Sequence, residues 1–353
     1  MTCMRIDRRD FALSLSAAAA SLAMTGSPAK ALANTGTKIT DPFALVDLEL
    51  LPVARALPDF TVTAESLPIM RARPAYPAIP VPAPQPQFQT IRGPRGAPDV
   101  RIMLIDGTEG KPDSPAYLHM HGGGFVGGKV DQSAAAYQAL AVACGCLIVS
   151  VDYRLAPEAR FPGALEDNYA ALRWLYGNAS KLGIDRKRIA IGGESAGGGH
   201  AAMLAIAARD RGEFPIAFQL LIYPMLDDRT GSSVEVPPHV GRILWNSASN
   251  RYGWGALLGQ APGSPKVPYG SVPARMENLE GLPPAFIAVG GLDLFVAEDI
   301  AYASRLNAAG VPAELLVVPG AFHGFDALVP NARVSKQFRA ATLAALKRAL
   351  RVI

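Results

Sequence analysis

Short runs of apolar residues alternate with longer amphipathic stretches from about residue 88 to the end of the chain. Short apolar runs bounded by turn-forming residues are typical of buried strands, and longer stretches with apolar positions three and four apart are typical of helices. The pattern predicts strands at about 88–92, 100–105, 115–120, 146–151, 188–192, 217–222, 285–290 and 314–318. It predicts helices at about 131–143, 163–179, 196–209, 297–309 and 332–351. After the two opening strands, strand and helix alternate, so we expect a mostly parallel sheet with helices on both faces.

The regular spacing is interrupted once, between the strand that ends near Tyr223 and the strand that starts near Ala285. About 60 residues intervene, and an insertion at this point would lie above the carboxyl ends of the strands. Its aromatic residues, Trp245, Tyr252 and Trp254, fit two interpretations equally well. They could belong to a cap over a pocket or to the ordinary packing of an exposed loop.

The segment from 34 to 84 differs from the rest of the chain in composition. It mixes short apolar stretches with a proline-rich passage that begins at Pro74. Proline fixes its own backbone and donates no hydrogen bond, so such a passage is a poor core element. We therefore expect an N-terminal cap or lid segment followed by a linker.

The first 33 residues have the pattern of an export signal. Arg8-Arg9 precedes an apolar run that ends at Met24, and Ala31-Leu32-Ala33 offers a small-residue cleavage site. The alternative is a frayed or anchoring helix, but the run of 14 weakly apolar residues is too short to span a bilayer. We expect a twin-arginine signal cleaved after Ala33, and a bacterial protein that is periplasmic or secreted, without stable membrane insertion.

Composition and charge exclude one class of partner. Half of the 353 residues are hydrophobic and 18% are charged, which suits a globular protein with a substantial core. The formal charge is +4, of which the first 33 residues contribute +2, and Lys and Arg do not cluster with interleaved aromatic residues. Nucleic acid is therefore not expected as a partner.

The cysteines do not indicate a disulfide. With Cys3 in the signal, only Cys144 and Cys146 could pair in the mature protein. Alternate residues of one strand cannot be bridged without distortion of the backbone. We expect both to be small buried hydrophobic residues.

One segment has the pattern of a catalytic serine. Gly193-Glu194-Ser195-Ala196-Gly197 has the form G-x-S-x-G, and it lies between a predicted strand and a predicted helix. Glycines permit the tight strand-to-helix turn that exposes the serine oxygen, and the helix N-terminus offers unpaired N–H groups beside it. A motif this short also occurs by chance, so its weight comes from the strand and the helix around it.

A second motif, His121-Gly122-Gly123-Gly124-Phe125, follows the third predicted strand. Three consecutive glycines let the backbone approach a substrate closely and direct N–H groups toward a developing oxyanion. The alternative is a plain loop that terminates the strand. The serine motif downstream favours an oxyanion hole.

A serine nucleophile requires a general base, and the chain has five histidines: His119, His121, His200, His239 and His323. The first two precede the serine, the third is on the helix after it, and the fourth is in the insertion. Only His323 follows the last predicted strand, in a loop that can bend over the carboxyl ends of the sheet. A metal site at the first two histidines is not expected, because no third ligand with suitable spacing is near.

The acid that orients the histidine should lie between the serine and the histidine in the chain. Asp293 fits best because it directly follows a predicted strand. Asp227 and Asp228, after the preceding strand, are the second choice. Glu298 and Asp299 lie in the next helix, where we expect them to cap the helix or to be solvated.

These motifs resemble the hormone-sensitive-lipase-like family of bacterial esterases, a branch of the α/β-hydrolase superfamily. The resemblance rests on His-Gly-Gly-Gly-Phe at 121–125, Gly-Glu-Ser-Ala-Gly-Gly at 193–198, and Asp-Tyr-Arg-Leu-Ala-Pro-Glu at 152–158 followed by Phe161-Pro162. It covers the chain from about residue 88 to the end. It implies an α/β-hydrolase fold with an eight-stranded, mostly parallel sheet, and a cap built from the N-terminal segment and an insertion after strand 6. The implied division is a signal at 1–33, a cap segment and linker at 34–84, a core at 85–228 and 284–353, and a cap insertion at 229–283.

Carried onto this sequence, the family pattern implies roles for six residues. They are a nucleophile, a base and an acid at Ser195, His323 and Asp293, and an oxyanion hole made by the N–H groups of Gly123, Gly124 and Ala196. The implied activity is hydrolysis of small-molecule carboxylic esters, with short to medium acyl chains, without a metal or cofactor. Whether the chain forms a homodimer is left open.

Two positions depart from the family pattern. Glu194 stands where Asp is commonest, and Leu294 stands where Pro often follows the acid. Neither change removes a catalytic group. Lactone, amide and polyester hydrolysis are rival activities on the same residues, because substrate choice depends on how the cap packs. A ligand-binding protein without catalysis is a further rival, against which the presence of His323 and Asp293 argues.

Overall fold

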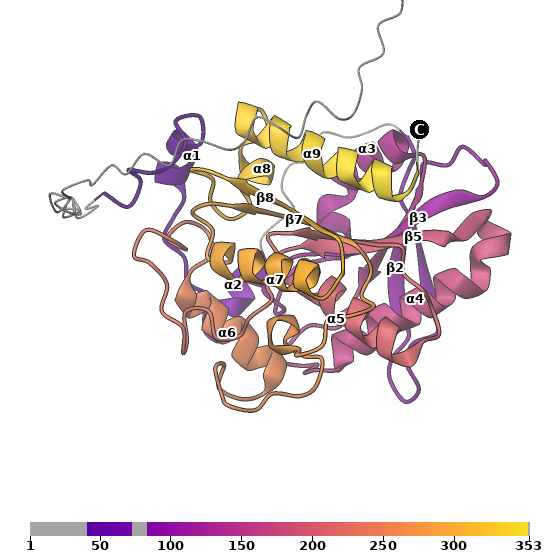
Figure 1. Ribbon diagram of the computed structural model, residues 1–353, viewed down its shortest axis with the longest axis horizontal. Helices are drawn as coiled ribbons and strands as arrows, with labels where there is room; N and C mark the ends of the chain where they lie inside the picture. The colour runs from indigo at the N-terminus through magenta and orange to yellow at the C-terminus, as the bar shows by residue number, and fades with distance from the viewer. Residues whose placement is uncertain (1–40, 73–82, 352–353) are drawn as a thin grey trace, which may run out of the picture. The chain divides into compact units, whose positions relative to one another are not determined.

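The computed structural model describes residues 41–72 and 83–351, which form one sheet between two layers of helices (Figure 1). The strands are β1 (Gln87–Ile91), β2 (Val100–Asp106), β3 (Ser114–Met120), β4 (Leu147–Asp152), β5 (Ile184–Glu194), β6 (Phe218–Ile222), β7 (Ala285–Gly290) and β8 (Ala313–Val318). Their order is β1-β2-β4-β3-β5-β6-β7-β8. The pairs β1–β2 and β2–β4 are antiparallel and the remaining pairs are parallel. The expected eight-stranded, mostly parallel sheet is confirmed. The predicted signal and the passage over 73–82 lie outside the described residues.

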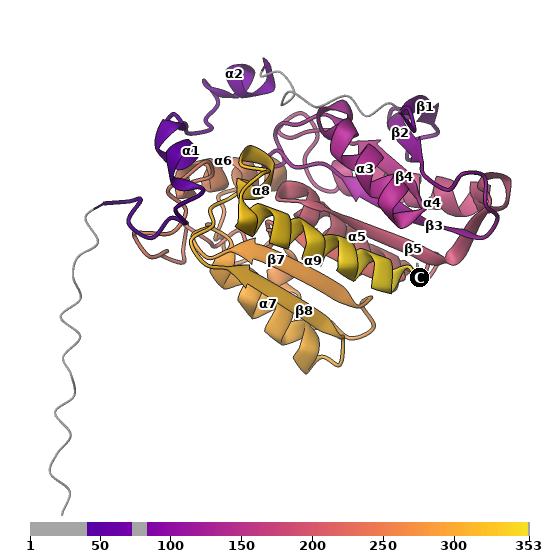
Figure 2. The ribbon, with the colours of Figure 1, turned by 90° about the horizontal axis from the view of Figure 1, so that it is seen from above.

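Both faces of the sheet are covered by helices, as the alternation of elements predicts. One face carries α3 (Ala134–Cys144) and α9 (Arg333–Ala349), and the other carries α4 (Gly163–Leu182), α5 (Ala196–Arg211) and α7 (Val296–Ala308) (Figures 1 and 2). Strands β3 and β7 are buried along their whole length, which explains why their sequences are largely apolar. Cys144 and Cys146 are buried with free thiols.

Four further helices were not predicted: α1 (Leu51–Ala56), α2 (Leu67–Ala72), α6 (Ser247–Leu258) and α8 (Phe325–Leu328). The longest of them, α6, contains Gly253 and Gly255, and glycine is a poor helix former. The packing of this helix explains Gly253, because a Cβ there would lie 2.5 Å from the carbonyl oxygen of Gly124. A tertiary contact therefore overrides a weak local preference.

The insertion between β6 and β7 contacts the N-terminal segment. The N–H group of Val62 donates to Ser249 Oγ at 2.9 Å, and Asn246 Nδ2 donates to Thr61 Oγ1 at 3.0 Å. Trp245 and Trp254 of the insertion are buried, which favours the interpretation of the insertion as a cap and not as an exposed loop. Figures 1 and 2 show α1 and α6 beyond the ends of the strands, at one end of the sheet.

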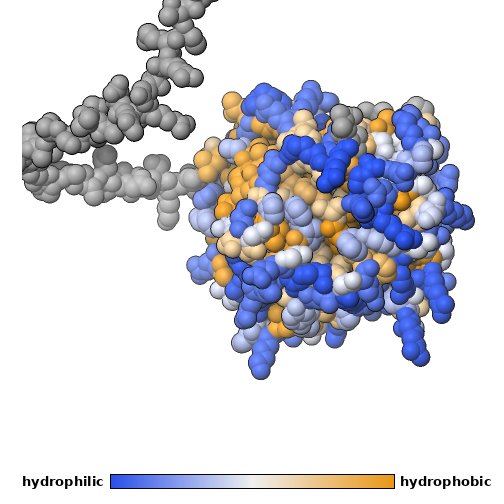
Figure 3. Space-filling view, turned by 45° about the vertical axis from the view of Figure 1, so that its right-hand side comes forward, coloured by the Kyte–Doolittle hydropathy of each residue, from blue (hydrophilic) through white to orange (hydrophobic). Residues whose placement is uncertain are grey.

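The surface is mixed in character. The face drawn in Figure 3 has hydrophobic residues among hydrophilic ones. Within the described ranges, no helix combines the length and the apolar character needed to cross a bilayer.

The end of β3 packs directly on the start of α5 through the two backbones. A Cβ at Gly197 would lie 2.0 Å from the Met120 carbonyl oxygen and 2.7 Å from that of His121. A Cβ at Gly193, on β5, would lie 2.1 Å from the same Met120 oxygen. Neither position can hold a side chain without separating the backbones, so the turn between β5 and α5 requires these glycines.

We expect Gly197→Ala to lower the free energy of unfolding by at least about 3 kcal/mol, because backbone atoms cannot move aside as a flexible side chain can. Gly177→Ala is the matched control, since Gly177 is in α4 and a Cβ there meets nothing within 4 Å. This control should raise stability by about 0.5–1 kcal/mol. Urea unfolding of both variants measures the difference, and equal effects would contradict the close approach.

Candidate active site

Ser195, His323 and Asp293 are joined by two hydrogen bonds, although they come from three separate loops. Ser195 Oγ lies 3.0 Å from His323 Nε2, and His323 Nδ1 lies 2.8 Å from Asp293 Oδ2. The three residues are 7%, 6% and 0% exposed. They follow β5, β8 and β7, whose parallel carboxyl ends meet at one edge of the sheet. The structure thus brings together the three residues that the sequence singled out.

Ser195 stands in a strained turn between the end of β5 and the start of α5. Its φ of 56° and ψ of −122° lie in a region that residues with a side chain rarely adopt. Three hydrogen bonds hold this backbone. The Ser195 N–H donates to the Ile222 carbonyl at 2.9 Å, and the Ser195 carbonyl accepts from the N–H groups of Met225 and Gly199 at 3.0 Å each. The turn therefore aims the hydroxyl at the histidine.

Asp293 uses both carboxylate oxygens. Oδ2 accepts from His323 Nδ1, and Oδ1 accepts from the N–H group of Phe295 at 3.1 Å. The residue lies just before α7, whose N-terminus favours a negative charge. With both oxygens held, the carboxylate fixes the orientation of the imidazole ring.

The second-choice acids are bonded elsewhere. Asp227 Oδ2 accepts from Arg229 Nη2 at 2.8 Å. Asp228 Oδ2 accepts from the Gly263 N–H at 2.7 Å and from Arg275 Nη2 at 3.1 Å. Both carboxylates therefore bind residues of the insertion and not the histidine.

The expectation that Glu298 and Asp299 cap their own helix or are solvated is wrong. They are 6% and 0% exposed, because this end of α7 packs against the turn after β6. Glu298 Oε1 accepts from the N–H groups of Leu226 and Asp227 at 2.7 and 3.1 Å. Burial raises the pKa of Glu298 and that of Asp299 well above the usual range of a carboxyl group. Periodicity alone does not reveal such a role, since the partners are about 70 residues away in the chain.

The glycine loop, residues 121–125, lies beside the nucleophile. A Cβ at Gly122 would be 3.5 Å from Ser195 Cβ. Gly123 and Gly124 have φ angles of 132° and 61°, which favour glycine. Ala196 is the first residue of α5, so its N–H group has no acceptor within the helix. The N–H groups of these three residues remain the predicted oxyanion hole.

The Asp152–Glu158 motif supports the glycine loop, a role that the sequence did not reveal. The Tyr153 hydroxyl donates to the His121 carbonyl at 2.5 Å, and the two rings stack with centroids 4.2 Å apart. The Ala156 N–H donates to the Phe125 carbonyl at 3.0 Å. Both ends of the glycine loop are thereby fixed.

Glu194, the departure from the usual aspartate, takes part in a partly buried hydrogen-bond network. Its carboxylate accepts from the Tyr137 hydroxyl and bonds to His119 Nε2 at 3.1 Å, and His119 Nδ1 lies 2.7 Å from Ser150 Oγ. Burial acts to raise the pKa of Glu194, but His119 and Tyr137 outweigh it and lower the pKa. In the described part of the chain, no group of three or more His, Cys, Asp or Glu side chains could hold a metal ion. His119 instead positions the residue next to the nucleophile.

Two histidines at the glycine loop are held neutral: His121 begins the loop, and His200 of α5 packs against its last residue, Phe125. Burial lowers the pKa of His121 to about 4 and that of His200 to about 3. The ring of His200 packs edge-on against Phe125 and Tyr153, with centroids 4.9 and 4.6 Å apart. Among the described residues, neither of its ring nitrogens has a hydrogen-bond partner. A proton on His200 would therefore place a charge without a hydrogen-bond partner next to the loop.

We expect His121 and His200 to contribute stability that is lost as the pH falls from 6.5 toward 4, while the raised pKa values of Glu298 and Asp299 act in the opposite direction. In this window the unfolded chain binds protons at His121 and His200 and the folded chain does not, so stability is present above pH 6.5 and is lost below it. His200 alone should contribute a loss of about 2 kcal/mol at pH 5, at 1.36 kcal/mol for each pH unit. Urea unfolding of the parent chain and of His200→Leu at pH 8, 6 and 5 measures this loss as the difference between the two chains.

His200→Leu should remove this contribution, so that between pH 8 and pH 5 the variant gains stability relative to the parent chain. His239→Leu, in the partly exposed insertion, is the control and should keep the acid sensitivity of the parent chain. Equal acid sensitivity in the two variants would contradict the role of His200.

Comparison with known proteins agrees with this geometry. A family model described as an alpha/beta hydrolase fold matches residues 117–327. The chain is 36% identical over 289 residues to Esterase LipI of Mycobacterium tuberculosis, and the aligned region covers 81% of this chain and 87% of that protein. It is 36% identical over 223 residues to an ethyl acetate hydrolase of Pseudomonas putida, and this aligned region covers 60% of this chain and 65% of that protein.

Solved structures show the same relation over most of the chain. Bacterial Heroin Esterase aligns with a TM-score of 0.77 and 36% identity, over 88% of this chain and 99% of that one. Esterase LipW of Mycobacterium marinum aligns with a TM-score of 0.74 and 32% identity, over 86% and 96%. The matched residues include the serine turn, the glycine loop and the two loops that carry the acid and the histidine. The chain belongs to the α/β-hydrolase-fold family, in its hormone-sensitive-lipase-like branch of esterases.

Proposed function

We propose that this chain is a serine carboxylesterase that hydrolyses carboxylic esters through an acyl-enzyme on Ser195. The observation that carries the proposal is the chain of hydrogen bonds from Ser195 through His323 to Asp293. The relatives support the substrate class, since they include Esterase LipI, Carboxylesterase NlhH and an ethyl acetate hydrolase.

The first step forms the acyl-enzyme. His323 Nε2 takes the proton of Ser195 Oγ, and the oxygen attacks the ester carbonyl. Asp293 stabilises the imidazolium that results, because its Oδ2 accepts from Nδ1. The negative charge that develops on the carbonyl oxygen is held by the N–H groups of Gly123, Gly124 and Ala196.

Collapse of this first intermediate completes the acyl-enzyme, since His323 donates its proton to the leaving alkoxide and the alcohol departs. The second step releases the acid. Water then enters, gives its proton to the same Nε2 atom, and attacks the acyl carbon on Ser195. Collapse of this second intermediate returns the proton to Ser195 Oγ and frees the carboxylic acid.

Short to medium acyl chains are the proposed substrates. The ethyl acetate hydrolase among the relatives supports a short acyl group by its name. The nucleophile is only 7% exposed, which also favours a small group at the scissile carbonyl. Lactones, amides and polyesters stay alternatives on the same three residues.

Ser195→Ala should lower kcat on p-nitrophenyl butyrate by about 10⁴-fold or more, because no other side chain supplies the nucleophile. Asp293→Asn should lower it by about 10³- to 10⁴-fold through loss of the correct imidazole orientation. Asp227→Asn is the matched control, since that carboxylate is bonded to Arg229, and it should keep most of the activity. Near-normal turnover by a folded Ser195→Ala or Asp293→Asn variant would remove that residue from the mechanism.

We also propose export of the folded enzyme, on the strength of Arg8-Arg9, the apolar run and Ala33, which lie outside the described residues. Replacement of both arginines by lysine should leave the activity in the cytoplasmic fraction of a bacterial host, because the twin-arginine pair is the recognised part of such a signal. Activity measured in periplasmic and cytoplasmic fractions tests this. Unchanged distribution would contradict the proposal.

A further inference from the structure

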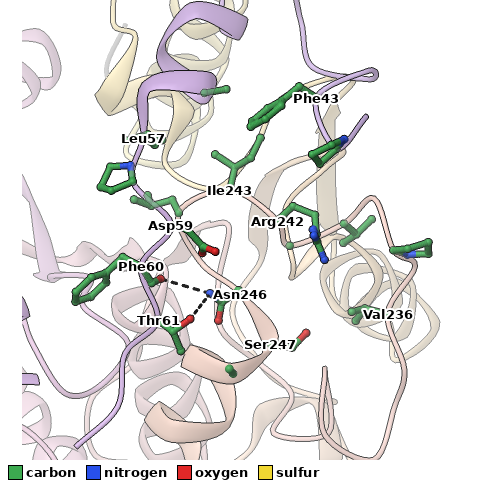
Figure 4. Close-up of a pocket in the computed structure, with 18 of the residues that line it drawn as sticks. Phe43, Leu57, Asp59, Phe60, Thr61, Val236, Arg242, Ile243, Asn246 and Ser247 are labelled. Atoms are coloured by element: carbon green, nitrogen blue, oxygen red, sulfur yellow. Dashed lines mark hydrogen bonds between the residues drawn. The ribbon is translucent and has the colours of Figure 1, made fainter. Parts of the chain in front are cut away.

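A cavity of about 570 Å³ lies between the N-terminal segment and the insertion (Figure 4). One wall consists of residues 57–61, and the other comes from residues between 236 and 248. Figure 4 shows the Asn246 amide at the cavity, bonded to the Phe60 carbonyl and to Thr61 Oγ1. The volume suits a small organic group, yet the cavity is lined neither by Ser195 nor by His323 within the described chain.

Leu244 lines this cavity and is the central residue of a strained turn. The Trp245 N–H donates to the Ile243 carbonyl at 2.9 Å, and Leu244 has a φ of 67°. This is a three-residue γ-turn with a positive φ, which is rare for a residue with a side chain. Such a conformation persists only where the surroundings hold it. Just before the turn, the Gly241 N–H donates to the Leu292 carbonyl at 3.0 Å and anchors the segment to the loop of the acid.

Leu244 contacts the loop of the histidine, and Trp245 contacts the glycine loop. A Cβ at Gly324, next to the histidine, would lie 3.1 Å from Leu244 Cδ2. A Cβ at Gly124, in the glycine loop, would lie 2.1 Å from Trp245 Cη2. The Leu244–Trp245 peptide therefore bridges the loops that carry the base and the oxyanion hole. Leu244 thus contacts the histidine loop and also lines the cavity.

The chemistry assigns the two sides of this bridge to different parts of an ester. The carbonyl oxygen is held at the glycine loop, which Trp245 borders. The alcohol leaves with the proton of His323, so it must lie on the histidine side, which Leu244 borders. The cavity beyond Leu244 is thus positioned for an extension of the alcohol and not of the acyl chain.

We infer that Leu244 is a specificity-determining residue, which closes the cavity to the alcohol moiety of the substrate and so limits the length of that moiety. This inference rests on the proposed esterase function. Truncation of Leu244 should join the cavity to the catalytic site. Each alcohol methylene that then enters the cavity should raise kcat/KM by roughly three- to fourfold, from the hydrophobic transfer of a methylene group.

The test compares two graded substrate series on the full chain. One series varies the alcohol, from ethyl to octyl butyrate, and the other varies the acyl chain, from p-nitrophenyl acetate to decanoate. In the parent enzyme, kcat/KM should fall with alcohol length. In Leu244→Ala, the ratio of kcat/KM for octyl butyrate to that for ethyl butyrate should rise at least about tenfold, because burial of two methylenes gives a change of this size. The acyl series should keep its profile.

Three further variants separate the side chain from other effects. Leu244→Gly should raise the ratio as Leu244→Ala does, and it also relieves the positive φ, so agreement between them assigns the effect to the side chain. Adding Ala248→Phe to Leu244→Ala refills the cavity and should remove the gain, since Ala248 lines it. Leu258→Ala removes a buried leucine from the far end of α6 and controls for general loosening of the insertion, so its ratio should stay at the parent value.

The outcomes discriminate clearly. An unchanged alcohol profile in both Leu244 variants, with butyrate esters still cleaved, overturns the inference and leaves the esterase function intact. A change confined to the acyl series, or an equal change in Leu258→Ala, also overturns it. Absence of ester hydrolysis in the parent enzyme removes the proposed function, and the inference fails with it.

Discussion

The backbone of Ser195 is held in a conformation that it would not adopt alone, and the rest of the site is arranged around that constraint. A φ of 56° is tolerable here because three backbone hydrogen bonds, to Ile222, Met225 and Gly199, fix the residue from both sides. The same turn needs Gly193 and Gly197, where backbones approach too closely for a side chain. A loss of this packing would move the nucleophile away from the histidine.

The glycine loop is the second element that depends on its surroundings. On the core side, Tyr153 donates a hydrogen bond to the loop, and the neutral ring of His200 packs against Tyr153. Because burial lowers the pKa of His200, this packing contributes stability that is lost in acid. From the insertion it is covered by Trp245 and by Gly253, whose contacts leave no room for side chains. The positions of the predicted oxyanion donors therefore depend on residues that are far from the glycine loop in the chain, both in the core and in the insertion.

The insertion between β6 and β7 acts on more than one part of the site. Through Gly241, Leu244 and Trp245 it contacts the loops of the acid, the histidine and the glycines in turn. A segment held at three points cannot move at one of them without strain at the others. The proposed control of substrate choice by Leu244 would therefore be coupled physically to the alignment of the catalytic groups, because the same few residues border the cavity and the catalytic loops.

The sequence by itself determined the eight strands, the five helices that cover the sheet and the chain order of Ser195, Asp293 and His323. These could be predicted because buried parallel strands must be apolar and because glycines mark the backbone turns that a nucleophile and an oxyanion hole need. Only the tertiary structure decided the hydrogen bonds among the three, the burial of Glu298, the helix through Gly253 and the turn at Leu244. Each of these depends on partners far away in the chain, and such contacts override local preference without leaving a periodic signal in the sequence.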